Sequence, residues 1–234
     1  MRVLALAAIL LSAAQAQAAS LTFSETEFGS GSYTSEKIGG FSSGTQVTSQ
    51  TASGNPGNAL SVTTIDSGHI YFAHFLDGAV ITPAHGQLFN LSYSIDYRMV
   101  TGGGAGMAFG LVLEQAGEYF LDSSFPVTGS ATSVWTTFSL AGLEDADFVD
   151  MDQLATSTQF GDPVDSVDFT LPSDIRIGFY TANSLSPNRT AFFDNVTITA
   201  NVAAAPVPLP AGLPLLLGAL GAVVAVRRRS AGPA

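Results

Sequence analysis

Carboxylates carry most of the reactive chemistry in this sequence, which has 19 aspartates and glutamates, three histidines and no cysteine. Five of the acids crowd into the nine residues from Glu144 to Asp152. This run lacks the spacing and the central glycine of an EF-hand calcium loop. We expect a solvated surface loop there, unless a cation bridges the carboxylates. His69 and His74 lie five positions apart, so on a strand they face opposite sides and are poor partners for one metal ion.

Signatures of catalysis are missing from the sequence. A glycosidase needs two carboxylates that face each other across a cleft. With 19 acidic residues some pair of carboxylates is always available, so the presence of such a pair is not evidence for a glycosidase. The patterns Glu-x-Asp-x-x-Glu and His-Glu-x-x-His do not occur. The glycine-rich stretch 101–106 has neither the lysine nor the following helix of a phosphate-binding loop. We therefore expect no catalytic residue and a non-enzymatic protein.

The central part of the chain is strongly acidic. All 19 acidic residues lie between Glu25 and Asp194, and four basic residues in that stretch leave a net charge of −15. These basic residues are Lys37, Arg98, Arg176 and Arg189. Such a surface repels nucleic acid and anionic lipid, so no nucleic acid is expected as a partner. It suits divalent cations or neutral polysaccharide, or it serves solubility alone.

Sugar binding would need exposed aromatic side chains that stack on sugar faces. The candidates are Trp135, Tyr33, Tyr71, Tyr119 and Tyr180. Trp135 stands in an apparent strand close to Phe138, so we expect it in the core. Tyr33 and Tyr119 are nearer to loops and are expected to be exposed. The sequence alone does not assign a ligand-binding site.

Alternating segments must position these side chains. In Leu91–Met99 the residues Leu91, Tyr93, Ile95, Tyr97 and Met99 share one face, which predicts a strand with that face on a core. Further strands are expected at 59–65, 69–75, 107–113, 118–121, 133–140, 175–181 and 189–199. No helical pattern of useful length occurs between residues 20 and 200. About nine to eleven strands predict an all-β fold, a jelly-roll-type antiparallel β-sandwich over residues 20–200.

The two ends have the form of targeting segments. Arg2, an apolar stretch and the small residues Ala16 and Ala18 predict a secretory signal peptide over residues 1–18 that is cut after Ala18, with Ala16 or Ala19 as alternatives. Near the other end, a linker at 201–206 precedes a proline-punctuated motif and an uncharged apolar run. The motif is Val207, Pro208, Leu209, Pro210 and Ala211, and the run stops at Arg227, Arg228 and Arg229.

The apolar run is long enough for a membrane helix when the motif is included. Residues 211–226 would span roughly 24 Å as a helix, and the motif brings the reach to about 30 Å, the thickness of a bilayer core. The arginines would then stay on the cytoplasmic side. The alternative is a buried core helix, which the arginines and the terminal position disfavour.

The last 28 residues resemble the PEP-CTERM class of bacterial sorting signals, in the variant whose motif is Val-Pro-Leu-Pro-Ala, which residues 207–211 match letter for letter. The resemblance implies recognition by an exosortase-type membrane transpeptidase, in addition to signal peptidase at the other end. It also implies export through the inner membrane and anchoring by the C-terminal helix over 207–229. Processing would then deliver the protein to the cell envelope or extracellular matrix.

The central domain resembles, from Gly54 to Thr199, the jelly-roll modules of proteins with such tails, and more loosely carbohydrate-binding modules. The matching pieces are residues 54–57, Trp135, 142–143, 147–148, 179–184 and 193–196. The resemblance implies a structural Ca²⁺ held near the first and last strands, where Glu25 or Glu27 and Asp194 stand in comparable positions. The alternative is that these are solvated edge carboxylates. No other cofactor is expected.

Two function classes follow. The first is an exported envelope or matrix protein whose sandwich has a structural or adhesive, non-catalytic role. The second is a secreted carbohydrate-binding module, with or without dependence on calcium.

Overall fold

The computed structural model describes residues 18–40, 44–65, 70–101, 107–124, 126, 128, 133–151, 166–183 and 189–203. They all belong to one compact unit, Gln17–Ala204. Ala18 is exposed, whereas Ala16, the motif at 207–211 and the arginines at 227–229 lie outside the described residues. Within the described ranges, no helix has the length and apolar character needed to cross a membrane.

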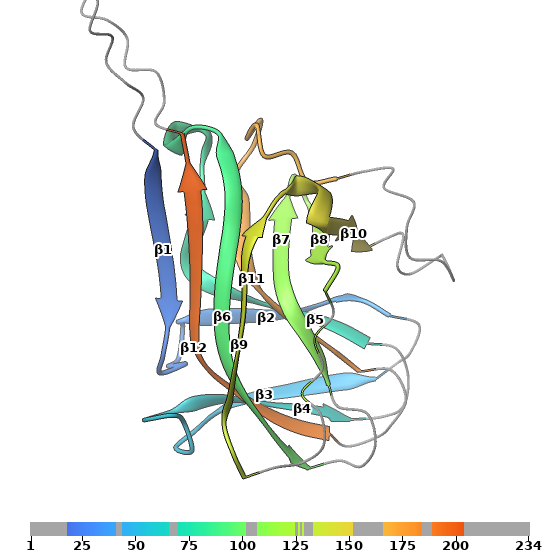
Figure 1. Cartoon of the computed structure of the whole chain (residues 1–234). Helices are drawn as coiled ribbons and strands as arrows, with labels where there is room; N and C mark the ends of the chain where they lie inside the picture. The colour runs from blue at the N-terminus through green and yellow to red at the C-terminus, as the bar shows by residue number, and fades with distance from the viewer. Residues whose placement is uncertain are drawn as a thin grey trace, which may run out of the picture. The chain divides into compact units, whose positions relative to one another are not determined.

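Two antiparallel sheets form a β-sandwich of jelly-roll type, as predicted (Figure 1). Sheet A runs in the order β3 (Thr45–Thr51), β4 (Ala59–Ile65), β12 (Arg189–Val202), β6 (Leu88–Thr101) and β9 (Thr136–Leu143), and β1 (Ala19–Glu25) also pairs with β12. Sheet B runs in the order β10 (Phe148–Asp150), β8 (Glu118–Asp122), β7 (Ala108–Gln115), β11 (Ile175–Asn183), β5 (Ile70–Ile81) and β2 (Tyr33–Gly39). Two 3₁₀ turns, η1 (Pro83–His85) and η2 (Asp145–Asp147), connect strands.

The long strand β12 changes partner along its length. Its first half pairs with β4 from Arg189 to Phe193, and its second half pairs with β1 as far as Val202. The register against β6 shifts between Asp194 and Thr197. Asn195 takes a positive φ of 48° at this irregularity, a conformation that asparagine tolerates better than most residues. In Figure 1, the lower parts of β6 and β12 curve toward β3 and β4.

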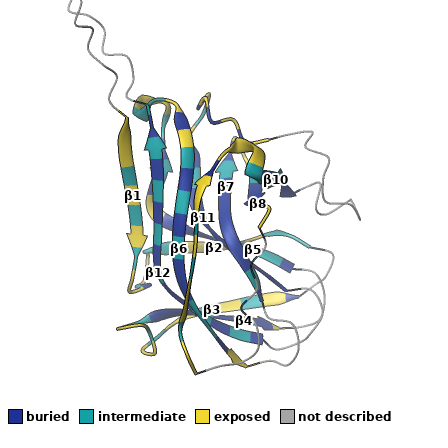
Figure 2. Cartoon of the chain, viewed as in Figure 1, coloured by how far each residue is buried: buried dark blue, intermediate teal, exposed yellow. Residues whose placement is uncertain are grey.

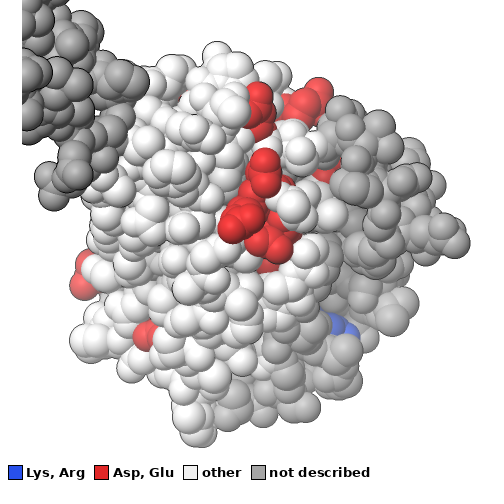
Figure 3. All heavy atoms as spheres, turned by 45° about the horizontal axis from the view of Figure 1, so that its top comes forward, with Lys and Arg blue, Asp and Glu red and all other residues white. Residues whose placement is uncertain are grey.

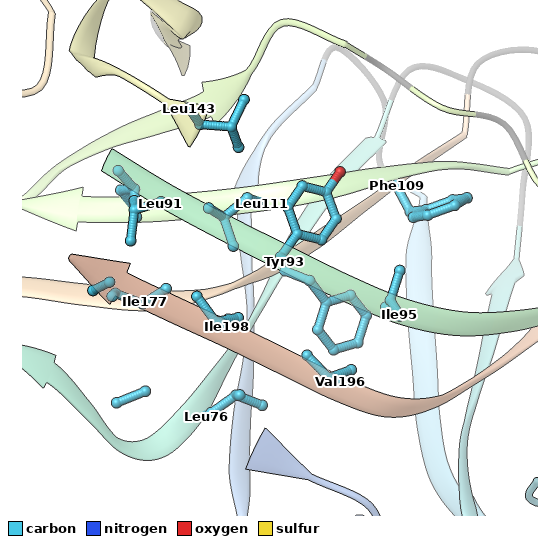
Figure 4. Close-up of a cluster of buried hydrophobic side chains, with 14 of the residues drawn as sticks. Leu76, Leu91, Tyr93, Ile95, Phe109, Leu111, Leu143, Ile177, Val196 and Ile198 are labelled. Carbon is cyan, nitrogen blue, oxygen red and sulfur yellow. The ribbon is translucent and has the colours of Figure 1, made fainter. Parts of the chain in front are cut away.

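An apolar core fills the space between the sheets (Figure 4). Tyr93 and Ile95 of β6 lie in it with Ile198 of β12, as the alternation of the sequence predicted. Three phenylalanine rings contact one another in it at inclined angles, with centroids 5.7 Å apart for Phe109 and Phe193 and 5.4 Å apart for Phe179 and Phe193. Such pairs add to the stabilisation that apolar burial supplies.

A second apolar cluster covers the outer face of sheet B. Its buried members are Ala73, Phe75, Val112, Leu121, Met151, Tyr180 and Ala182. β7 and β11 are therefore buried on both faces along most of their length (Figure 2). Their near-continuous apolar sequences suit this position, since a strand covered on both sides has no need of polar alternation.

The acidic run after Leu143 is not wholly a loop, which corrects the sequence-based expectation. Residues 145–147 form η2, but Phe148–Asp150 forms β10 and pairs with β8. The reason is Phe148, which is 1% exposed and contacts Phe169 in the core. Asp152 lies outside the described residues.

Candidate functional site

A shallow hollow of about 440 Å³ is lined by residues of β2 and β3, which are edge strands of the two different sheets. Its lining consists of Phe28, Gly29, Ser30, Gly31, Tyr33, Ser35, Thr48 and Gln50. None of these side chains is charged. The hollow therefore combines an aromatic ring with neutral hydroxyl and amide groups, on a domain that carries many carboxylates (Figure 3).

Strand alternation places the polar groups of the hollow. On β2, Tyr33 and Ser35 face the hollow, whereas Glu36 faces the other side and approaches Arg176 at 3.7 Å. On β3, Thr48 and Gln50 are two positions apart and share the face toward the hollow. The period of two thus supplies neutral polar groups from both strands.

The loop between β1 and β2 closes the end of the hollow. The Glu25 carboxylate accepts hydrogen bonds from the backbone N–H groups of Glu27 at 2.8 Å and Phe28 at 2.6 Å. Phe28 takes a φ of 46° and buries its ring against Phe179 and Tyr33, edge-on to the latter at 5.7 Å. Glu25 and Phe28 therefore fix the position of Tyr33.

Behind the hollow, a polar layer replaces the apolar core between the sheets. It is made up of Ser35, Gln46, Thr64, His74, Thr181 and Asn183. Ser35 Oγ lies 2.7 Å from His74 Nδ1, and His74 Nε2 lies 3.0 Å from Thr181 Oγ1. Gln46 Nε2 donates to Thr181 Oγ1 at 2.9 Å, and Asn183 Nδ2 donates to Thr64 Oγ1 at 3.1 Å.

His74 is the buried centre of the polar layer. It is 0% exposed, and burial lowers the pKa of His74 to about 3. The ring is therefore neutral at ordinary pH, with one donor and one acceptor nitrogen. A base this weak is a poor proton acceptor for catalysis near pH 7. His69, which the sequence spacing predicted not to share a metal ion with His74, lies outside the described residues.

A network of carboxylates and amides surrounds the irregularity of β12. The Asp194 carboxylate accepts hydrogen bonds from the backbone N–H groups of Asn55 and Asn195. The Asp96 carboxylate accepts from the side-chain amides of the same two asparagines at 3.1 and 2.8 Å. Burial raises the pKa of Asp194, the two N–H donors lower it, and the carboxylates of Asp96 and Glu27 raise it further.

The three predicted calcium ligands do not share one arrangement. Glu27 and Asp194 lie within electrostatic reach of each other, and Glu27 accepts a hydrogen bond from Asn58 Nδ2 at 2.9 Å. Glu25 instead binds backbone N–H groups of its own loop. Within the ranges that the structure describes, no group of three or more His, Asp or Glu residues is placed to hold a metal ion.

The expectation that Trp135 lies in the core is wrong. Trp135 is half-buried, and the Arg98 guanidinium stacks between its ring and that of Phe192, 5.0 and 5.1 Å from the two centroids. Trp135 and Phe138 are three positions apart, so on one strand they face opposite sides. Phe138 takes the inward side, against Phe109.

The other aromatic candidates separate into two places. Tyr33 lines the hollow. Tyr71, Tyr119 and Tyr180 gather on the outer face of sheet B. Tyr180 is 0% exposed there, and Tyr119, half-buried, lies near Glu36 and Glu114. The structure therefore assigns Tyr33, of the five candidates, to a concave neutral surface.

Sequence reasoning missed the polar partners of Tyr33. Ser35, Thr48 and Gln50 belong to polar edge strands that lack apolar alternation. The available signal was the repeat Gln46-x-Thr48-x-Gln50, which places three neutral polar groups on one face.

No family model and no curated protein sequence matches this chain. Among solved structures, a family 11 carbohydrate-binding module from Clostridium thermocellum, in complex with a β-1,3-1,4-mixed-linked tetrasaccharide, aligns at 14% identity with a TM-score of 0.47 over 80% of this chain and 98% of that chain. A carbohydrate-binding module studied for specific mannan recognition aligns at 13% identity with a TM-score of 0.43, over 79% and 98%.

A protein of unknown function from Shewanella oneidensis aligns at 12% identity with a TM-score of 0.45, over 89% of this chain and 98% of that chain. At these identities and TM-scores, the similarities carry no conclusion about the ligand or activity of the present chain.

Proposed function

We propose that the sandwich is a non-catalytic module that binds neutral polysaccharide at the hollow between β2 and β3. The observation that carries the proposal is the lining of the hollow. Tyr33 supplies an aromatic ring, and Ser35, Thr48 and Gln50 supply neutral hydrogen-bonding groups around it. Sugars are recognised by this combination of an apolar surface with a few polar groups.

The charge of the domain supports a neutral ligand. The stretch that contains the sandwich has 19 acidic and four basic residues, so an anionic polymer would approach against repulsion. The described residues that line the hollow have no charged side chain. A neutral polysaccharide is not repelled electrostatically as it approaches the domain. It also buries no charged side chain of the described lining when it binds in the hollow.

A binding assay with matched tyrosine variants tests the proposal. Full-length protein is screened by affinity electrophoresis in gels that contain neutral glucan, mannan or xylan, with polygalacturonate as the anionic comparison. We expect retardation by at least one neutral polymer and none by polygalacturonate. Tyr33→Ala should abolish the retardation. Tyr119→Ala, on the outer face of sheet B, is the control and should retain it.

The reverse pattern would contradict the assignment. If Tyr119→Ala abolished binding and Tyr33→Ala kept it, the site would lie on sheet B and not at the hollow. If no neutral polymer retarded the wild-type protein, the structural role without polysaccharide binding would replace the proposal.

We also propose that the two ends deliver the module, on the strength of the sequence motifs alone. In this proposal the signal peptide leads to export, and the tail with its motif at 207–211 is a substrate of an exosortase-type transpeptidase. The binding module would then act as an adhesive component of the envelope or extracellular matrix. Intact-mass measurement of protein recovered from envelope and medium tests this. A C-terminus near residue 211 supports processing, and a mass that extends to Ala234 in the membrane contradicts it.

Calcium binding stays a prediction with a separate test. Glu27 and Asp194 could supply carboxylate oxygens, but the orientation of Glu25 means that backbone oxygens would have to complete the six to eight ligands of Ca²⁺. Calorimetric titration with Ca²⁺ should give binding heat and a higher melting temperature, both lost in Asp194→Asn. Neither heat nor a change in melting temperature in the wild-type protein would contradict the prediction.

A further inference from the structure

A continuous chain of hydrogen bonds behind the hollow links Gln46, Thr181, His74 and Ser35. Gln46 Nε2 is a donor only, and it donates to Thr181 Oγ1 at 2.9 Å. The Thr181 hydroxyl can then direct its own hydrogen to His74 Nε2, 3.0 Å away. With Nε2 as the acceptor, the proton of the neutral imidazole belongs on Nδ1. In that tautomer, Nδ1–H would donate to Ser35 Oγ, which lies 2.7 Å away.

This direction determines what Ser35 offers to the hollow. When its oxygen accepts a hydrogen bond from His74 Nδ1–H, its own O–H is available to donate to a ligand. Ser35 is exposed and lines the hollow, so the O–H is accessible. Burial keeps His74 neutral, with its pKa lowered to about 3, so the arrangement does not change across the ordinary pH range.

Gln50 offers the opposite polarity on the neighbouring strand. Its Nε2 donates to the backbone carbonyl of Glu27 at 2.7 Å. The same amide carries an acceptor oxygen, Oε1, on a side chain that lines the hollow. Ser35 on β2 can thus offer a donor and Gln50 on β3 an acceptor to the same ligand.

We propose that the relay Gln46–Thr181–His74 makes Ser35 a fixed hydrogen-bond donor that selects saccharides presenting an acceptor oxygen beside a hydroxyl donor. Vicinal hydroxyl groups of a neutral hexose or pentose unit meet this requirement. A deoxy sugar that lacks the oxygen would leave the Ser35 hydroxyl unpaired. This inference rests on the proposed polysaccharide function, and it adds the residue that discriminates among sugars.

The state of His74 is measured directly by NMR. Full-length protein with ¹⁵N-labelled histidine is studied by long-range ¹H–¹⁵N correlation, and the His74 signals are identified by their loss in His74→Gln. We expect a neutral ring with the proton on Nδ1 and a bare Nε2. A proton on Nε2 would overturn the relay, because Nδ1 would then accept from Ser35 and consume its hydrogen.

Binding by relay variants gives the second measurement. The relay predicts that Ser35→Ala loses about tenfold in affinity for the neutral polymer that the wild-type protein binds, the loss expected for one hydrogen bond. Ser35→Thr, which keeps the hydroxyl, should restore binding. Thr181→Val should behave like Ser35→Ala, and Thr181→Ser should behave like the wild type. Circular dichroism confirms that each variant is folded.

The outcomes separate this inference from the proposed function. If the wild-type protein binds and Tyr33→Ala does not, but Ser35→Ala and Thr181→Val bind like the wild type, the relay is overturned and the polysaccharide site survives. If the wild-type protein binds no neutral polysaccharide, the function fails, and with it the selecting role of Ser35, whatever the tautomer of His74.

Discussion

Phe179 and Thr181 stand two positions apart on the inward face of β11, yet they belong to two differently built regions. Phe179 packs against Phe193 in the apolar core, with ring centroids 5.4 Å apart. Thr181 joins the polar layer through His74 and Gln46. The boundary runs along the His74 ring, whose centroid lies 4.8 Å from that of Phe179.

The apolar core and the polar layer contribute to different properties, the core to the stability of the fold and the layer to the orientation of polar side chains. Apolar burial is non-directional and supplies most of the favourable free energy of folding. A hydrogen-bonded layer contributes little net free energy, but it is costly when one partner is lost and it fixes side-chain orientation. We infer that the core stabilises the sandwich, whereas the polar layer orients the groups of the hollow.

The largest effect is expected in the core. Phe193→Ala removes a ring that is 0% exposed and should lower the free energy of unfolding by about 3–5 kcal/mol. Urea denaturation measures the change. Val47→Ala, at a side chain 51% exposed, is the control and should change it by less than about 0.5 kcal/mol. A cost below about 1 kcal/mol at Phe193 would show that the rings are not packed as described.

A smaller effect is expected from the polar layer. Thr181→Val keeps the shape of the side chain but leaves His74 Nε2 and Gln46 Nε2 without their shared partner. We expect a loss of about 2–3 kcal/mol in the free energy of unfolding. Thr45→Val on exposed β3 is the matched control. If Thr181→Val were as stable as Thr45→Val, the hydrogen bonds of the polar layer would not contribute to the stability of the sandwich.

The pH dependence of stability comes next in size. Folded His74 takes up a proton only near pH 3, whereas an unfolded histidine does so near pH 6.5. The unfolded chain therefore binds more protons below pH 6.5, and stability falls as the pH falls. Between pH 6.5 and 5 the loss should be about 2 kcal/mol.

His74→Gln isolates this effect in the same denaturation experiment. Burial raises the pKa values of Asp122 and Asp194, and these carboxylates act in the opposite sense because their folded forms hold protons longer. They are common to both proteins and cancel in the comparison. The variant should lose less stability than the wild type over the same interval, and parallel curves would contradict a buried neutral His74.

The apolar core could be predicted from the sequence, whereas of the candidate site only Tyr33 was found and its polar partners were not. The core face of β6 follows from alternation of large apolar residues such as Leu91 and Ile95, which bury where expected. β2 and β3 are edge strands with polar sequences, so no apolar period marks them. The hollow depends on these two strands, whose meeting is a tertiary event that local patterning does not encode.

His74 shows the same limit of sequence-based prediction for a single residue. His74 follows Ile-Tyr-Phe-Ala in an apolar strand, a context that indicates burial. Its partners Ser35 and Thr181 lie 39 and 107 positions away in the chain. Only the fold brings them within hydrogen-bond distance, so the relay could not be inferred from spacing.

Chemical-shift mapping with a neutral polysaccharide tests the role of the hollow most directly. Amide signals of ¹⁵N-labelled full-length protein are followed as soluble neutral glucan, mannan or xylan is added. We predict that saturable shifts concentrate at Phe28–Ser35 and Thr48–Gln50, and that Tyr33→Ala removes them. Shifts that concentrate on the outer face of sheet B, or no shifts with any neutral polymer, would contradict the assignment.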